Sequence, residues 1–153
     1  MSKIYIIGPV GSGKTTLART LSKKLNIKYH ELDKIVWDDD AGNIKRNPVE
    51  IKKLFDDILN DENWIIEDVG RDIFKRGISE ADIVYYLNLA PTKIYIRITT
   101  RWIKQKLHLE TYNYRPTLKG LKEMYKWAQN DLLKKDEKIY YIKENSKEYR
   151  IIK

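Results

Sequence analysis

Eight consecutive residues near the start of the sequence have the types and spacing of a phosphate-binding loop, Gly8-Pro9-Val10-Gly11-Ser12-Gly13-Lys14-Thr15. They match the pattern G-x-x-x-x-G-K-[ST], with an apolar run before it and a helical pattern after it. Glycines allow backbone N–H groups to turn inward around phosphates, and the start of the following helix adds its positive end. We expect Lys14 to reach the β- and γ-phosphates and the Thr15 hydroxyl to hold Mg²⁺.

The pattern predicts a nucleotide site. No N-K-x-D motif for reading a guanine base is present, which favours ATP over GTP. The residues expected to bind the nucleotide are Gly8, Val10, Gly11, Ser12, Gly13, Lys14, Thr15 and Thr16.

Two arginines, Arg97 and Arg101, lie four residues apart after Pro91. On a helix this spacing places both guanidinium groups on one face, where like charges repel unless an anion lies between them. The segment has two interpretations, because Pro91 suits the first turn of a helix while "IYIRIT" alternates as a strand does. We favour the helix. The pair then either contacts phosphate or consists of two surface arginines.

Apolar periodicity predicts strands and helices that alternate along the chain. The run from Ile4 to Ile7 is typical of a buried parallel strand. Further strands are predicted at residues 27–32, 63–66, 83–89 and 139–142. Helical stripes are predicted over residues 17–25, 51–59 and 118–132, and Ser146 is expected to cap a short terminal helix.

Residues 34–46 have the composition of a loop, and Asn47 to Glu50 has that of a helix start. Asn47 suits the cap, Pro48 the first turn, and Glu50 is expected to reach back to the cap. Alternating strands and helices predict an α/β fold with a parallel sheet covered on both faces. We find no internal repeat and no linker that would divide the chain.

The bulk composition fits one cytoplasmic domain. The chain has 153 residues, 42% of them hydrophobic, and no cysteine, which excludes disulfides and thiolate metal sites. The early apolar run is too short for a signal peptide or a membrane span, so we expect no membrane partner. The net charge of +8 fits a solvated surface, small phosphorylated ligands or nucleic acid.

Several blocks together resemble the small P-loop kinases related to adenylate kinase, and most of all the bacterial group called DNA topology modulation proteins. The blocks are "KIYIIGPVGSGKTTLA", "YHELDKIVW", "WIIEDVGRDIF", "ADIVYYLNL" and "RITTRWI", which together cover nearly the whole chain. The resemblance implies a three-layer P-loop fold with a five-stranded parallel sheet, like that of nucleoside monophosphate kinases. It also implies an acceptor-binding insertion at residues 34–62 and a lid at 102–117.

The resemblance also implies roles for carboxylates that follow two of the strands. Asp33 is expected to act either as the acceptor-side base or as a group near Mg²⁺. A carboxylate after "WII" commonly orders the water around Mg²⁺, and either Glu67 or Asp68 fits this role. We expect Glu67 to lie near both Mg²⁺ and the acceptor.

Four arginines receive roles in the same way. Arg71 falls on the arginine that grips the acceptor phosphate in adenylate kinases, although the surrounding D-G-F-P-R motif is replaced here by Glu67-Asp68-Val69-Gly70-Arg71. Arg101 is expected to stabilise charge on the transferring phosphoryl group, with Arg97 beside it on the ATP. Arg115 is expected in the lid, and Arg46 near the acceptor.

Two functions remain open. The first is transfer of the γ-phosphoryl group of Mg-ATP to a small acceptor. Arg71 favours a nucleoside monophosphate as that acceptor, whereas Asp33 and the missing D-G-F-P-R motif favour a hydroxyl compound. The second is a nucleotide-dependent DNA-binding protein that modulates topology, supported by the charge of +8 but by no known nucleic-acid-binding motif.

Overall fold

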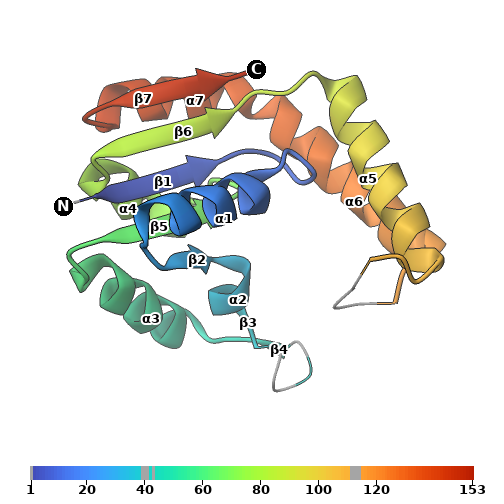
Figure 1. Ribbon diagram of the computed structural model, residues 1–153, viewed down its shortest axis with the longest axis horizontal. Coiled ribbons are helices and arrows are strands. Elements are labelled where there is room, and N and C mark those ends of the chain that lie inside the picture. Colours follow the sequence, from blue (N-terminus) through green and yellow to red (C-terminus); the bar gives the residue numbers. More distant parts are fainter. Residues whose placement is uncertain (1, 39–41, 43, 111–114) are drawn as a thin grey trace.

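The computed structural model describes residues 2–38, 42, 44–110 and 115–153. A five-stranded parallel sheet forms its centre, with strand order β2-β5-β1-β6-β7 (Figure 1). The strands are β1 (Lys3–Ile7), β2 (Tyr29–Glu31), β5 (Trp64–Asp68), β6 (Ile83–Leu87) and β7 (Tyr149–Ile152). The expected α/β fold and five-stranded parallel sheet are therefore confirmed.

Helices cover both faces of the sheet. On one face, α1 (Lys14–Leu25) packs against alternate residues of the central strands, including Ile4, Ile6 and Ile65. The opposite face is covered by α3 (Pro48–Asn60), α4 (Lys75–Glu80) and α7 (Lys135–Asn145), which enclose the largest apolar cluster. A short 3₁₀ turn, η1 (Asp72–Phe74), precedes α4.

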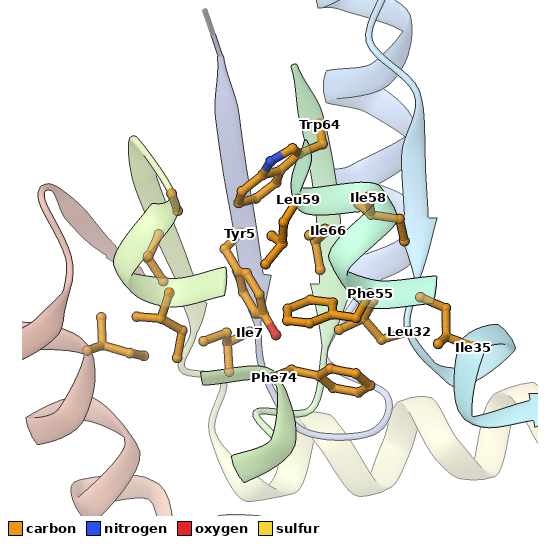
Figure 2. Packing of buried hydrophobic residues seen from close by; sticks show 14 of the residues in the cluster. Tyr5, Ile7, Leu32, Ile35, Phe55, Ile58, Leu59, Trp64, Ile66 and Phe74 are labelled. Atoms are coloured by element: carbon orange, nitrogen blue, oxygen red, sulfur yellow. The ribbon is translucent and has the colours of Figure 1, made fainter. Parts of the chain in front are cut away.

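The largest cluster centres on aromatic side chains (Figure 2). Tyr5 and Trp64 are at most 1% exposed, and the rings of Phe55 and Phe74 lie 4.8 Å apart. Burial of this apolar area is the main favourable term in folding, and it fixes β1 and β5 side by side. Their carboxyl ends, which continue into the loops after Ile7 and Asp68, are thereby held together.

Two long helices extend beyond the carboxyl ends of the strands (Figure 1). The first, α5 (Pro91–Lys106), confirms the helix at Pro91 and shows that a strand there is wrong. It packs against α6 (Leu118–Leu133) through a third cluster that contains Ile94, Ile98 and Ala128. The expected lid at 102–117 thus begins inside α5, and residues 111–114 lie outside the described residues.

The last predicted strand was wrong in position. Residues 139–142 belong to α7, where Ile139 and Ile142 point toward the core at helical spacing while Tyr140 is 67% exposed. Ser146 ends α7, its N–H donating to Ile142 O at 2.9 Å, and begins no helix. The fifth strand is β7, an exposed edge strand of four residues in which Arg150 interrupts the apolar residues.

Residues 34–46 were expected to be a loop, and this too was wrong in part. The segment begins within α2 (Asp33–Val36). It also contains two short antiparallel strands, β3 (Trp37–Asp38) and β4 (Ile44–Lys45). Asn47 caps α3 as predicted, accepting from the Glu50 N–H at 2.9 Å. The Glu50 carboxylate, however, lies 3.2 Å from Arg46 Nε. No helix in the described part of the chain has the length and apolar character needed to cross a bilayer.

Candidate phosphate-binding site

The loop from Gly8 to Thr15 joins the end of β1 to the first turn of α1. Gly13 has a φ of 97°, a left-handed conformation that glycine adopts without steric cost. A Cβ atom there would lie 3.3 Å from Arg97 Nη1. No side chain caps the start of α1 and its first turn holds no acidic residue. The helix therefore presents unpaired N–H groups and a positive end that suit an anion.

The side chain of Ser12 marks where a ligand oxygen would fit. The Ser12 hydroxyl is buried and has no hydrogen-bond partner among the described residues. Buried hydroxyl groups are nearly always paired, so this one calls for a partner such as a phosphate oxygen. The Ser12 carbonyl accepts from Arg97 Nη1 at 2.8 Å, which places Arg97 directly on the loop.

Arg101 lies one helical turn beyond Arg97 and does not contact the loop in this arrangement. Its Nε is 3.6 Å from Glu110 Oε1, and its side chain is 58% exposed. The predicted arginine pair therefore shares a helix, as expected, but only Arg97 meets the phosphate loop.

Lys14 lies within its own loop, with Nζ donating to Pro9 O at 3.0 Å. Burial lowers the pKa of Lys14, and the negative charges of Glu67, Asp68, Asp33 and Asp131 oppose that shift. The amine thus lies near four carboxylates from three elements, β5, α2 and α6. A cation on a flexible four-carbon stem in this position is able to turn toward phosphate oxygens.

Thr15 and Glu67 meet at the end of the neighbouring strand. The Thr15 hydroxyl donates to Glu67 Oε1 at 2.7 Å, and Glu67 is only 7% exposed. Burial raises the pKa of Glu67, while Lys14 and the Thr15 hydroxyl act in the opposite direction. A hydroxyl and a carboxylate oxygen side by side are suitable ligands for Mg²⁺ or its bound water.

Asp68, the other candidate for the metal, has different partners. Its Oδ2 accepts from Gly70 N at 2.8 Å and from Arg71 N at 2.6 Å, and its Oδ1 accepts from the Arg71 guanidinium. Arg71 also donates to Asp33 through its other terminal nitrogen. The structure therefore brings together three predicted residues, with Arg71 between two aspartates, and places Glu67 beside Thr15.

Arg46 contacts the segment around α2 and the start of α3 through its three guanidinium nitrogens. Its Nη1 donates to three backbone carbonyls, the closest being Lys34 O at 2.6 Å, and ion pairs join Nη2 to Asp38 and Nε to Glu50. All three nitrogens thus have protein partners. Arg46 also lines an open hollow of about 720 Å³ at the edge of β2, to which no residue of the phosphate loop contributes.

Arg115 is exposed and directly follows residues 111–114, which lie outside the described part. Its expected role in a lid stays a prediction.

Lys138 was not anticipated from the sequence. It lies on α7, and its Nζ donates to Val69 O at 2.7 Å and to Asp131 Oδ1 at 2.8 Å. This pair joins α6 and α7 to the loop that carries Arg71. No short-range motif links Lys138 to a carbonyl 69 residues away, so only the tertiary structure reveals the contact.

Known kinases resemble parts of this chain. A shikimate kinase from Sulfurihydrogenibium sp. is 40% identical over 45 residues, which are 29% of this chain and 27% of that protein. A cytidylate kinase from Sulfolobus acidocaldarius is 33% identical over 103 residues, 62% of this chain and 54% of that protein. The chain thus spans about a quarter to a half of the length of these two relatives.

The fold is shared with solved kinases. The structure of shikimate kinase from Acinetobacter baumannii in complex with shikimate aligns with a TM-score of 0.61 at 18% identity, covering 98% of this chain and 83% of that one. A family model described as AAA domain matches residues 4–113, a range that contains the phosphate loop, Glu67 and Arg97. The chain belongs to this AAA domain family.

Proposed function

We propose that this chain is a P-loop phosphotransferase that moves the γ-phosphoryl group of Mg-ATP to a small-molecule acceptor, such as a nucleoside monophosphate or a similar metabolite. The observation that carries the proposal is the Thr15–Glu67 pair beside the Lys14 amine, in a loop whose buried Ser12 hydroxyl has no partner among the described residues. The similarity to shikimate and cytidylate kinases supports the same reaction class.

Each group has a distinct task in this reaction. Lys14 and Arg97 hold the phosphates and offset the negative charge that develops on them. Thr15 and Glu67 hold Mg²⁺ and its waters, and the ion, when bound, draws charge from the phosphate oxygens. Where the acceptor attacks through a hydroxyl group, Asp33 accepts its proton. The bond between the γ-phosphorus and the β–γ bridging oxygen breaks, the acceptor oxygen bonds to phosphorus, and ADP leaves.

Binding of the acceptor is assigned to the predicted insertion and lid. Residues 34–62 are proposed to bind the acceptor and residues 102–117 to close over it, with Arg101 and Arg115 turning inward when the lid closes. Arg71 and Arg46 are the acceptor-facing arginines of this scheme. A cytoplasmic location and membership of the topology modulation group are part of the same proposal. A DNA-binding role rests on the net charge of +8 and on basic tracts such as "RWIKQK".

The direct test is Mg²⁺-dependent conversion of ATP to ADP, measured with nucleoside monophosphates, nucleosides and small hydroxyl metabolites in turn. Large stimulation by one compound would identify the acceptor. Lys14→Ala should nearly abolish turnover, whereas Lys24→Ala, at an exposed position of the same helix, should not. Wild-type turnover in Lys14→Ala would show that the proposed mechanism is wrong.

A further inference from the structure

The free edge of β2 borders a hollow that has no part in the proposed phosphoryl transfer. β2 forms one edge of the sheet, with α3 beside it (Figure 1). The hollow, of about 720 Å³, is lined by residues 28–31 and by parts of α2 and α3, and no residue assigned above to ATP, Mg²⁺ or proton transfer contributes to it. Clefts of this volume commonly hold ligands. Its occupant is therefore a separate question from the phosphoryl acceptor.

The backbone of β2 presents two residues to the open side of this edge. Lys28 O accepts a hydrogen bond from β5 at 3.2 Å, and Leu32 N donates one to β5 at 3.1 Å. Successive residues of a strand in a parallel ladder direct their backbone groups to opposite sides. Tyr29 and Glu31 therefore direct their N–H and C=O groups away from β5, where no strand of the described chain pairs with them.

The spacing of these backbone groups fits an extended peptide. Two residues of a strand span about 6.6 Å, and an added strand presents its own N–H and C=O groups at the same interval. Unpaired edges of this kind are where proteins accept a strand from another chain. Apolar side chains from α2 and α3 also line the hollow, namely Ile35, Leu54 and Ile58. An added strand would place an apolar side chain against them.

Two carboxylates at the end of α3 favour a basic group on the occupant. Asp57 and Asp61 both line the hollow and lie four residues apart, and the last turn of α3 holds no basic residue. Like charges at this spacing repel each other, and the C-terminus of a helix carries a partial negative charge of its own. A cation bound here would relieve both sources of repulsion.

The basic residues of the hollow do not fill this place. Lys34 pairs with Glu31 at 3.1 Å, and Arg46 pairs with carboxylates that lie outside the hollow. Lys28 is then one cation against the two carboxylates of α3. The local balance is decisive despite the net charge of +8, because exposed charges more than about 8 Å apart are largely screened at physiological salt.

The geometry points to the β2 edge as a docking site for an extended segment of a partner protein that carries an apolar and a basic side chain on one face. The segment pairs through its backbone with Tyr29 and Glu31. Its apolar side chain packs against the apolar residues of α2 and α3, and its basic side chain meets the two carboxylates of α3. The inference goes beyond the proposed function and does not depend on it.

The test titrates the capped peptide Thr-Val-Thr-Arg-Thr into the full chain and follows the backbone amide signals by ¹H–¹⁵N NMR. Valine and arginine, two residues apart, share one face of an extended peptide. We expect saturable shifts of the Tyr29 and Glu31 amides at millimolar peptide, whereas the Leu32 amide, already bonded to β5, should shift little. The same peptide with all its amides N-methylated should cause no shift. Glutamate in place of arginine should weaken binding by about tenfold or more.

The double variant Asp57→Asn/Asp61→Asn should weaken binding of the arginine peptide by about three- to tenfold. Glu123→Gln/Glu137→Gln is the matched control, because it removes two exposed carboxylates that do not line the hollow, and it should bind like the wild type. The inference is overturned if the two β2 amides show no saturable shift, or if the glutamate peptide or the α3 variant binds as tightly as the original pair. Shifts of the same amides with protein concentration alone would also overturn it, since a second copy would then occupy the edge.

Discussion

Replacing Lys138 with methionine should loosen the loop that holds Arg71. The Lys138 Nζ donates to Val69 O at 2.7 Å and to Asp131 Oδ1 at 2.8 Å, and both charged side chains are 17% exposed. Methionine keeps the apolar stem but leaves a carboxylate and a carbonyl without their donor. A hydrogen bond to a charged group contributes about 1.5–3 kcal/mol, and partial exposure favours the lower half of that range.

We therefore expect Lys138→Met to lower the free energy of unfolding by about 2 kcal/mol, and the midpoint temperature by about 4–8 °C for a domain of this size. Urea unfolding followed by circular dichroism gives the free energy directly. The Arg71 Nε–H signal should also shift without any ligand, because Gly70 and Arg71 follow the released carbonyl.

Lys143→Met on the same helix is the control, since residue 143 is exposed and the substitution removes the same charge. The double variant Lys138→Met/Asp131→Leu removes both charges and should recover part of the loss, because no carboxylate stays buried alone. The reasoning is refuted if Lys138→Met costs no more than Lys143→Met, or if the double variant is as unstable as the sum of its single changes.

Two other substitutions test the same edge of the sheet. Burial raises the pKa of Glu67, so the folded chain binds this proton more tightly than the unfolded chain, and stability falls as pH rises between the two pKa values. Above the raised pKa, Glu67→Gln should therefore unfold at a higher urea concentration than the wild type, and this difference should vanish in acid. The variant should also lose Mg²⁺-dependent turnover. A difference in urea midpoint that does not change with pH would contradict this reasoning. Gly70→Ala should cost about 1–3 kcal/mol, since Gly70 has a φ of 88° and a Cβ there would lie 3.1 Å from Ile7 Cγ2. Gly42→Ala, with a φ of 81° and no atom of the described residues within 4 Å of the added Cβ, should cost less in the same urea experiment.

The phosphate loop could be predicted because its chemistry is local. Gly13, Lys14 and Thr15 act through backbone conformation and a helix start that are specified within a few residues. The buried strands were also readable, since β1 and β6 are nearly continuous apolar runs. In both cases the sequence pattern that predicts the structure lies within a few consecutive residues.

The edge strand and the ion pairs were not readable, because their determinants are distant in sequence. β7 has only four residues and Arg150 interrupts its apolar residues, so it lacks the continuous apolar run that marks β1. Residues 139–142 carry such a run but lie in α7, because a short apolar run is compatible with either element until its packing partners are known. The pairing of Arg71 with Asp33 spans 38 residues, beyond any local pattern.

Distance in sequence also explains why the acidic partners of the arginines were not predicted. A guanidinium in isolation predicts an anion, so Arg46 and Arg71 each suggested a phosphate on the acceptor. Parallel strands bring their carboxyl ends to one edge, and in this chain that edge collects Asp33, which follows β2, and Asp68, which ends β5. Asp33 and Asp68 meet the arginine before any ligand does, so the group left facing solvent is a carboxylate. The sequence of a single arginine segment therefore cannot show that Arg71 is shared between Asp33 and Asp68, because that pairing depends on how the strands are assembled.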